Sequence, residues 1–149
     1  MQPNVIIPVL NKFFLTRDCL RSLRRHAPEQ DMEVLVEDNG SADATAAGLD
    51  PLGAELFGDR FRAIHLAENR NFAPACNLGA REAGGRHRFF LNNDTVLPPG
   101  WYPPLLEALR GGCGAAGPLL MYPARGPLPL DRVRHLRVAC QPKLHFCHL

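Results

Sequence analysis

Three polar residues, Asn92, Asn93 and Asp94, end a run that is expected to be a buried strand, in the segment RFFLNNDTVLPPGW. Polar side chains crowded at the end of a strand are costly to bury, and they are useful where a ligand binds there. A carboxylate flanked by amides can hold a hard divalent cation through oxygen and leave positions open for phosphate and water. Asp94 could equally cap the turn into VLPPGW, and the motif alone does not separate the two interpretations.

Other polar residues follow three earlier apolar runs. They are Asn11, the segment Asp38-Asn39-Gly40-Ser41 and the segment Glu68-Asn69-Arg70-Asn71. Asp38 could belong to a plain turn, or it could accept a hydrogen bond from a base or a ribose, as the acid after the second strand does in dinucleotide folds. Arg70 could pair with a phosphate, although solvation is the simpler interpretation for a single arginine.

Short aliphatic runs alternate with helical patterns, and this alternation would position the polar residues. Strands are expected at residues 5–10, 32–37, 61–66, 86–91 and 114–122. Helices are expected in LTRDCLRSLRRH, in ADATAAGL with Ser41 as its cap, from Asn71 to Gly84-Gly85, and in WYPPLLEAL. Strands separated by helices imply right-handed crossovers and a mainly parallel α/β sheet with helices on both faces. Such sheets bind ligands beyond the carboxyl ends of their strands, where the polar residues fall.

The composition is that of a soluble globular protein. The chain has 149 residues, 46% of them hydrophobic, and a net charge of +2, and its pI near 8.4 is too mild to indicate a nucleic-acid partner. The short N-terminal apolar run predicts neither a signal peptide nor a transmembrane segment. Five cysteines without close-set pairs indicate free thiols. The expected location is therefore the cytoplasm, and a peripheral position at a membrane is also compatible.

Five segments stand in the order and spacing of a known enzyme family. They are VIIPVLN followed by LRSL, then VEDNGSADAT, AENRNFAPACNLGAREAGG, FFLNNDTVLPPGW and GAAGPLLMYP, and they cover about residues 4–123. Together they resemble the inverting glycosyltransferase family 2, and specifically its rhamnosyltransferase-like branch. The resemblance implies a GT-A fold, with a Rossmann-like and mainly parallel sheet. Residues 1–123 would form the part that binds a nucleotide-sugar, and residues 124–149 an atypical, irregular tail.

The resemblance also implies roles for individual residues around the donor. Pro8 and Asn11 would lie beside the nucleotide base. Asp38 would hydrogen-bond the base or the ribose of a nucleotide-diphosphate sugar, with a UDP- or dTDP-sugar as the expected donor. Arg70 and Asn77 would face the nucleotide and the diphosphate. These residues would therefore form the donor-binding wall of the site.

The triplet Asn92-Asn93-Asp94 would be the counterpart of the family's D-x-D metal motif. Asp94 would bind Mg²⁺ or Mn²⁺ bridging the donor's diphosphate, and the ion would neutralise charge on the leaving group. Asn92 replaces the first aspartate, so it could still meet a ribose hydroxyl but would add no charge for the metal. Asn71 stands where the family often has glycine, and asparagine tolerates positive φ better than most residues.

The implied reaction transfers a sugar to the hydroxyl of a saccharide or lipid-linked acceptor, with inversion, as in cell-wall or polysaccharide biosynthesis. No catalytic base is assigned, because only 55 residues follow Asp94 and the context of Asp131, the only acid after Glu107, does not match the family. The C-terminal part of the usual domain is therefore expected to be missing. A truncated or degenerate nucleotide-sugar-binding protein without transfer activity is the alternative. A Rossmann-type oxidoreductase is disfavoured, because VIIPVLNKFF lacks the glycine fingerprint.

Overall fold

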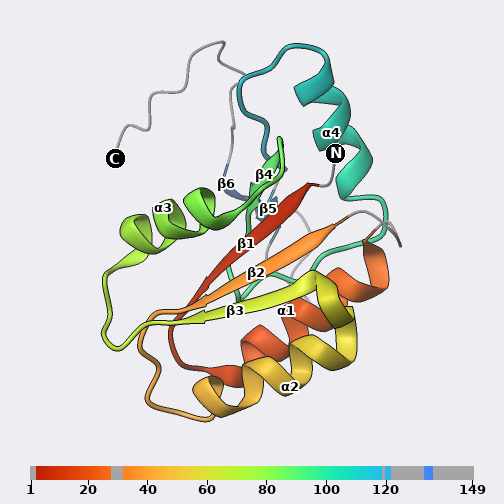
Figure 1. Cartoon of the computed structure of the whole chain (residues 1–149). Helices are drawn as coiled ribbons and strands as arrows, with labels where there is room; N and C mark the ends of the chain where they lie inside the picture. Colours follow the sequence, from red (N-terminus) through yellow and green to blue (C-terminus); the bar gives the residue numbers. More distant parts are fainter. Residues whose placement is uncertain (1–2, 28–31, 119, 122–132, 136–149) are drawn as a thin grey trace. The chain divides into compact units, whose positions relative to one another are not determined.

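The computed structural model describes residues 3–27, 32–118, 120–121 and 133–135 (Figure 1). The chain forms two compact units, Met1–Pro99 and Gly100–Leu149. The first unit carries a parallel sheet, and the second carries a helix and a two-stranded antiparallel sheet. None of the helices in the described ranges combines the length and the apolar character needed to cross a membrane.

Four parallel strands form the sheet of the first unit. They are β1 (Asn4–Val9), β2 (Glu33–Asp38), β3 (Phe61–His65) and β4 (Arg88–Phe90). Their order is β3-β2-β1-β4, so the chain moves one way across the sheet as far as β3 and then returns to the other side of β1. This reversal makes the carboxyl ends of β1 and β4 a topological switch point, where open α/β sheets bind ligands.

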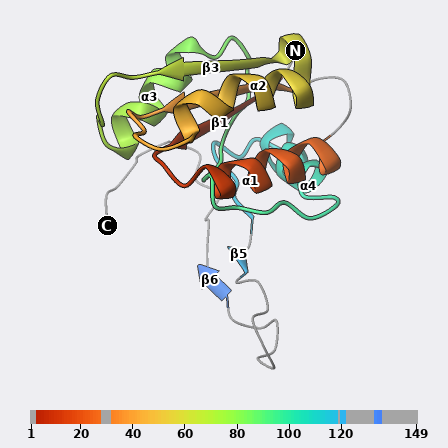
Figure 2. The same ribbon diagram turned by 90° about the horizontal axis from the view of Figure 1, so that it is seen from below.

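Three helices connect these strands. They are α1 (Phe13–His26), α2 (Thr45–Phe57), which continues into the short 3₁₀ turn Gly58–Arg60, and α3 (Phe72–Glu82). Helices α1 and α2 lie side by side, whereas α3 packs against β1 and β2 (Figures 1 and 2). The apolar spacing of α1 buries Cys19, Leu20 and Leu23. The predicted α/β sheet with crossover helices is therefore confirmed.

Alternate residues of the sheet face different helices. Ile6 and Glu37 lie against Gly79 of α3, whereas Phe61 lies against Gly53 of α2. In the register of the sheet, the β2 residue that pairs with Phe61 is an odd number of positions from Glu37. Successive side chains of a strand point to opposite faces, so Phe61 and Glu37 lie on opposite faces. The α3 face and the α2 face are therefore opposite sides of the same sheet. The core between them includes Val5, Ile6, Ile7, Leu20, Leu35 and Leu49, each no more than 1% exposed.

Strand β4 differs from the expectation of a buried strand. It contains only three residues, and the side chain of Phe90 is 45% exposed. The physical reason is its place in the sheet, because β4 is an edge strand that pairs only with β1 among the described residues. An apolar run indicates a strand whose side chains are suited to burial. Whether they are buried depends on the neighbours that the tertiary structure supplies.

The predicted capping role of Ser41 is wrong. Helix α2 begins at Thr45, and the Oγ of Ser41 instead accepts a hydrogen bond from the backbone N–H of Asn11 at 2.7 Å. The backbone N–H of Thr45 donates to Oδ1 of Asp43 at 2.9 Å. The helix is also longer than expected, because it continues through Pro51. Ser41 therefore joins two loops, and Asp43 accepts the hydrogen bond from the first residue of the helix.

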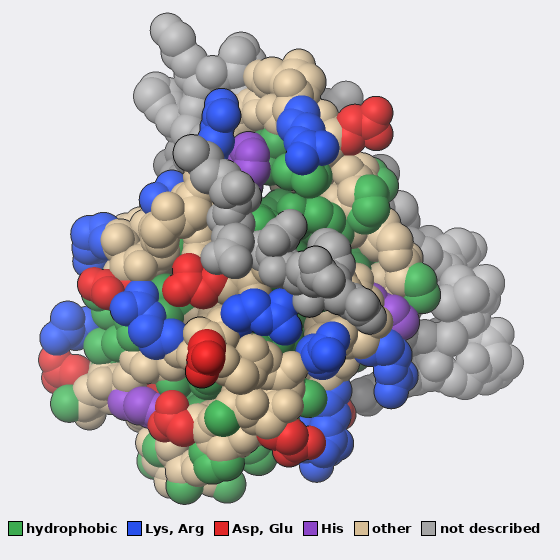
Figure 3. All heavy atoms as spheres, turned by 45° about the vertical axis from the view of Figure 1, so that its right-hand side comes forward, with side chains coloured by type: hydrophobic (Ala, Val, Ile, Leu, Met, Phe, Trp, Pro, Cys, Tyr) green, Lys and Arg blue, Asp and Glu red, His purple; other side chains and the backbone are tan. Residues whose placement is uncertain are grey.

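The second unit contains α4 (Tyr102–Arg110), β5 (Leu120–Met121) and β6 (Val133–His135). Strand β5 falls within the predicted fifth strand, but it is shorter and pairs antiparallel with β6, outside the parallel sheet. Apart from β6, the tail predicted at residues 124–149 lies outside the described residues. On the face shown in Figure 3, acidic and basic side chains are interspersed among the described residues.

Candidate functional site

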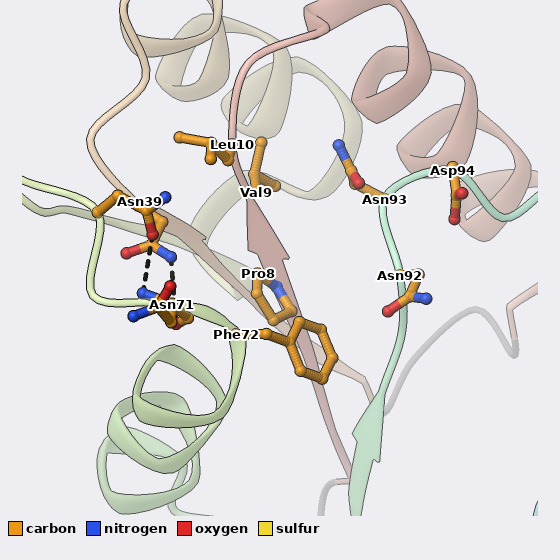
Figure 4. Close-up of a pocket in the computed structure, with 10 residues that line it drawn as sticks. Pro8, Val9, Leu10, Asn39, Asn71, Phe72, Asn92, Asn93 and Asp94 are labelled. Atoms are coloured by element: carbon orange, nitrogen blue, oxygen red, sulfur yellow. Dashed lines mark hydrogen bonds between the residues drawn. The ribbon is translucent and has the colours of Figure 1, made fainter. Parts of the chain in front are cut away.

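A pocket of about 490 Å³ opens at the switch point of the first unit (Figure 4). Its walls come from the end of β1 and from the loops that follow β2, β3 and β4. The lining residues are Pro8, Val9, Leu10, Asn39, Asn69, Asn71, Phe72, Asn92, Asn93 and Asp94. Half of them are asparagines and only one carries a charge, so the pocket offers neutral donors and acceptors around a single carboxylate. Its volume is that of an ordinary small-molecule site.

Asn39 joins two of the loops that form the pocket. Its side-chain Nδ2–H donates to the backbone carbonyl of Asn71 at 3.2 Å (Figure 4). Its Oδ1 accepts from the backbone N–H of Arg70 at 2.8 Å. Asn39 is only 4% exposed, so its end of both bonds is buried. The sequence placed Asn39 in a polar cluster without a role, because these partners lie more than 30 positions away in the chain.

The start of α3 projects an aromatic ring toward the pocket. Asn71 precedes the helix with φ at 69°. This value confirms that asparagine accepts positive φ at a position where the family that the sequence resembles often has glycine. The next residue, Phe72, is 58% exposed and its ring lies near Pro8 (Figure 4). A flat apolar face beside a proline at a wet pocket is suited to stack against a planar ligand. Phe72 was not singled out from the sequence, because the apolar character of a residue does not show whether it is exposed.

The loop after β4 brings Asn92, Asn93 and Asp94 to the opposite wall of the pocket. This loop is fastened to α1 at two points. The Nδ2–H of Asn93 donates to Oγ1 of Thr16 at 3.0 Å, and the thiol of Cys19 lies 3.7 Å from the carbonyl oxygen of Asn92. Burial raises the pKa of Cys19 to about 12, with the charge of Asp94 adding to the shift, so the thiol stays protonated and can donate.

A third bond continues the same attachment. The backbone N–H of Leu97 donates to Oγ of Ser22 at 3.0 Å. Thr16, Cys19 and Ser22 are three residues apart in turn, so they lie along one buried stripe of α1. This stripe was not identified from the sequence. Its spacing shows that the three residues share one face of α1, and the hydrogen bonds show that the loop carrying Asp94 lies against that face.

Asp94 and its neighbours have the chemistry of a shared cation site. The carboxylate of Asp94 and the amide oxygens of Asn92 and Asn93 are hard oxygen ligands at one wall of the pocket. Within the described residues, no group of three or more His, Cys, Asp or Glu side chains could hold a metal ion alone. Mg²⁺ is commonly bound by one or two carboxylates together with water and substrate phosphates. The residues present therefore fit an ion that a phosphorylated ligand helps to hold.

Four of the predicted site residues lie outside the pocket lining. Asn11, at φ 56°, ties the loop after β1 to the loop after β2, because its Oδ1 accepts from the backbone N–H of Ala42 at 2.8 Å. Arg70 contributes its backbone N–H to Asn39, and its side chain is exposed. Asn77 is exposed on α3. The fourth, Asp38, is buried beneath the rim, so the predicted contacts of all four with a nucleotide stay predictions.

Asp38 ends β2 and is 2% exposed. Its Oδ1 accepts from the backbone N–H of Ser41 at 2.9 Å, and its Oδ2 lies 3.1 Å from Nδ1 of His65. The other ring nitrogen of His65, Nε2, lies 2.9 Å from Oδ2 of Asp50. No sequence pattern singled out His65 or Asp50. Each oxygen of Asp38 therefore has one hydrogen-bond partner among these residues.

Comparison with known families matches residues 4–141 to Glycosyl transferase family 2. Among curated proteins, the uncharacterized glycosyltransferase YfnE of Bacillus subtilis (strain 168) is 35% identical over 96 residues. Those residues are 64% of this chain and 24% of that protein. The family match extends beyond the five segments on which the resemblance was based, because it reaches into the C-terminal region.

Several solved glycosyltransferase structures are similar to this chain. The mannosyltransferase PcManGT from Pyrobaculum calidifontis, in complex with GDP-Man and Mn²⁺, has a TM-score of 0.60 and 27% identity, covering 65% of this chain and 28% of that chain. S. aureus TarS 1-349 in complex with UDP-GlcNAc has a TM-score of 0.54 and 26% identity, covering 63% of this chain and 27% of that chain. The chain therefore spans about a quarter of the length of the relatives it matches.

Proposed function

This chain belongs to glycosyl transferase family 2 and has the GT-A fold, and from that premise we propose that its pocket binds the nucleotide-diphosphate part of a sugar donor. The observation that carries this proposal is the pocket at the carboxyl ends of β1 and β4, which the Asp94 loop lines together with Pro8 and Asn39. Amide groups, one carboxylate and an exposed aromatic ring suit a ligand that has a planar base and a charged diphosphate.

The proposed contacts divide between the two walls of the pocket. Pro8 and Asn11 lie on the base side, together with Phe72. Asp38 accepts a hydrogen bond from the base or the ribose, while Asn92 meets a ribose hydroxyl from the opposite wall. Arg70 and Asn77 are assigned to the nucleotide and diphosphate side, where an exposed guanidinium is free to pivot toward a phosphate. That last assignment requires the two side chains to turn toward the pocket on binding.

A divalent cation, Mg²⁺ or Mn²⁺, is part of this proposal, with Asp94 as its protein ligand. The similar PcManGT structure is a complex with both GDP-Man and Mn²⁺, which supports an ion beside the donor in this chain as well. When bound, such an ion neutralises negative charge on the nucleoside diphosphate that leaves. Asp94 would place the ion beside the diphosphate, and the bonds from Thr16 and Cys19 would keep its loop in position.

For the whole protein we propose transfer of the sugar to a hydroxyl of a saccharide or lipid-linked acceptor, with inversion, as a hexosyl- or rhamnosyltransferase of the cytoplasm or a membrane surface. UDP- and dTDP-sugars are the expected donors, and the GDP-Man complex of PcManGT adds a GDP-sugar to the set that a test must include. One observation favours binding without transfer by this 149-residue chain. Among the described residues that line the pocket, Asp94 is the only carboxylate, so none of the others could act as the base.

Calorimetric titration of the purified chain with UDP-GlcNAc, dTDP-rhamnose and GDP-mannose, each with Mn²⁺, tests the binding proposal. We expect heat of binding with at least one donor, and at least about tenfold weaker binding for Asp94→Asn, which corresponds to about 1.4 kcal/mol. Asp59→Asn is the matched control, because Asp59 is an exposed acid outside the pocket. Absence of heat with all three donors, while circular dichroism shows a folded chain, would refute the proposal.

A turnover assay with the same donors separates transfer from binding alone. Release of nucleoside diphosphate that depends on a saccharide acceptor would establish transfer by this chain. Binding without such release would favour the second candidate, a nucleotide-sugar-binding protein.

A further inference from the structure

His65 connects two carboxylates at the carboxyl end of the sheet. Its Nδ1 lies 3.1 Å from Oδ2 of Asp38, and its Nε2 lies 2.9 Å from Oδ2 of Asp50. A neutral imidazole can donate through only one nitrogen, whereas an imidazolium donates through both. The two carboxylates are therefore both satisfied only when the ring is protonated.

The surroundings of the ring favour that protonated form. The hydrogen bond to Asp38 is the largest cause of a raised pKa of His65; partial burial opposes it, and Asp50 adds to the rise. Within the part of the chain that the structure describes, these two carboxylates, one from β2 and one from α2, are the charged groups that act on the ring. The side chain of Asp38 is 3% exposed and that of Asp50 is 65% exposed. Water can replace the ring at Asp50 but not at Asp38.

The contact matters for the pocket because Asp38 is adjacent to Asn39, which lines it. The backbone N–H of Ser41 fixes one oxygen of Asp38, and the ring of His65 fixes the other. We propose that protonated His65 is a positioning residue that holds Asp38 for the donor nucleotide and makes donor affinity fall as the pH rises. This inference rests on the proposed function of the pocket, and it assigns the ring no contact with the donor.

Two effects of deprotonation act in the same direction. Two carboxylates and one imidazolium carry one net negative charge, whereas the same group with a neutral ring carries two. The rim of the pocket then repels an anionic diphosphate more strongly. The hydrogen bond to Asp38 also loses the positive charge on its donor, which weakens it. Since the ring is partly exposed and screened, we expect donor affinity to fall by about threefold to tenfold.

The test is a pH profile of donor affinity between pH 5.5 and 8.5, for UDP-GlcNAc and GDP-mannose with Mn²⁺. Both phosphates of these donors are esterified, so they lack the terminal phosphate group that would titrate near a pH of about 6. We expect the wild-type chain to bind more weakly as the pH rises through the pKa of His65, above its ordinary 6.5. His65→Gln, which can still donate one hydrogen bond to Asp38, should lose this pH-dependent step.

Two further variants sharpen the comparison. Asp50→Asn removes one of the two charges that favour the imidazolium, so the midpoint of the profile should move to lower pH while the step remains. His87→Gln is the matched control, because His87 precedes β4 at the opposite end of the sheet, and it should keep the wild-type profile. A direct measurement of the His65 pKa by NMR should give the same midpoint as the binding profile.

The outcomes separate this inference from the function on which it rests. If His65→Gln binds with the same pH step as the wild type, or if Asp50→Asn leaves the midpoint unchanged, the positioning role is refuted. If the histidine only fastens α2 to the sheet, thermal stability changes with pH but donor affinity does not, which also refutes it. If the wild-type chain binds no donor at any pH, the proposed function itself fails.

Discussion

Glu37 and Asp38 are consecutive acids of β2, and both are buried, yet their surroundings differ completely. Asp38 accepts hydrogen bonds from Ser41 and His65. Glu37 is 0% exposed, and no well-formed hydrogen bond reaches either of its carboxyl oxygens within the described part of the chain. Burial raises the pKa of Glu37 to about 7, and the backbone N–H of Gly79 offsets this only in part.

The difference follows from the alternation of side chains along a strand. Asp38 points to the face where the loops at the carboxyl ends supply a backbone N–H group and a histidine, so each of its oxygens has a hydrogen-bond partner. Glu37 points under α3, where the neighbouring groups are Ile6, Cys76 and the backbone of Gly79. One face of β2 therefore supplies hydrogen bonds to a carboxylate, whereas on the other face burial favours the protonated form of the acid.

The largest expected effect is on the pH dependence of stability, when Glu37 is replaced by a residue that does not titrate. The folded state binds the proton of Glu37 more tightly than the unfolded state, since the pKa rises from 4.5 to about 7. The free energy of unfolding therefore falls as the pH rises from 4.5 through about 7 and then levels off, by about 3 kcal/mol in total. Urea unfolding at pH 5 and pH 8 should show this loss in the wild type and little of it in Glu37→Gln.

The control for that experiment is Glu55→Gln, which changes an exposed acid of α2. It should keep the wild-type loss of stability between pH 5 and pH 8. A Glu37→Gln variant that still loses as much stability as the wild type would show that another group causes the pH dependence.

A smaller effect is expected from filling the space above Glu37. A Cβ on Gly79 would lie 2.4 Å from Oε1 of Glu37 and 2.5 Å from Cγ2 of Ile6. Gly79→Ala should lower the free energy of unfolding by about 2 kcal/mol, because overpacking outweighs the better helix propensity of alanine. Thermal unfolding in a double-mutant cycle with Glu37→Ala checks the cause. The cost should shrink when the carboxyl group is absent, and an unchanged cost would assign the clash elsewhere.

The smallest effect concerns the attachment of the Asp94 loop to α1. Thr16→Val removes the acceptor for Asn93 and should lower stability by about 1 kcal/mol while weakening donor binding severalfold. Ser22→Ala removes a comparable bond, to Leu97, which lies outside the pocket lining. It should cost similar stability and leave donor affinity nearly unchanged, as calorimetry can measure. Equal losses of affinity in both variants would contradict a local role for Thr16.

The alternation of apolar runs and helical patterns was enough to predict the order of strands and helices in the first unit. The same pattern predicted that polar groups would gather at one edge, and the structure brings Pro8, Asn92 and Asp94 into one pocket. The edge exposure of β4 was missed, because a run such as RFFL indicates apolar character but not which neighbours cover it.

The polar contacts of the site were harder to predict because their partners are distant in sequence. His65 lies 27 positions from Asp38 and 15 from Asp50, so no local spacing indicates the group. Ser41 was assigned to the nearest helix, whereas its partner is Asn11, 30 positions earlier. The unusual state of Glu37 likewise depends on Gly79, which reaches it only through the packing of α3 on the sheet.

The central claim is that the pocket at the carboxyl ends of β1 and β4 binds a nucleotide-diphosphate sugar together with a divalent cation. Amide NMR spectra recorded with the donor that binds by calorimetry, and then with trace Mn²⁺, test this directly. We predict that the paramagnetic ion broadens the signals of residues 92–94 most strongly, and more strongly with donor than without it. Broadening centred elsewhere in the chain, or independent of the donor, would contradict the account.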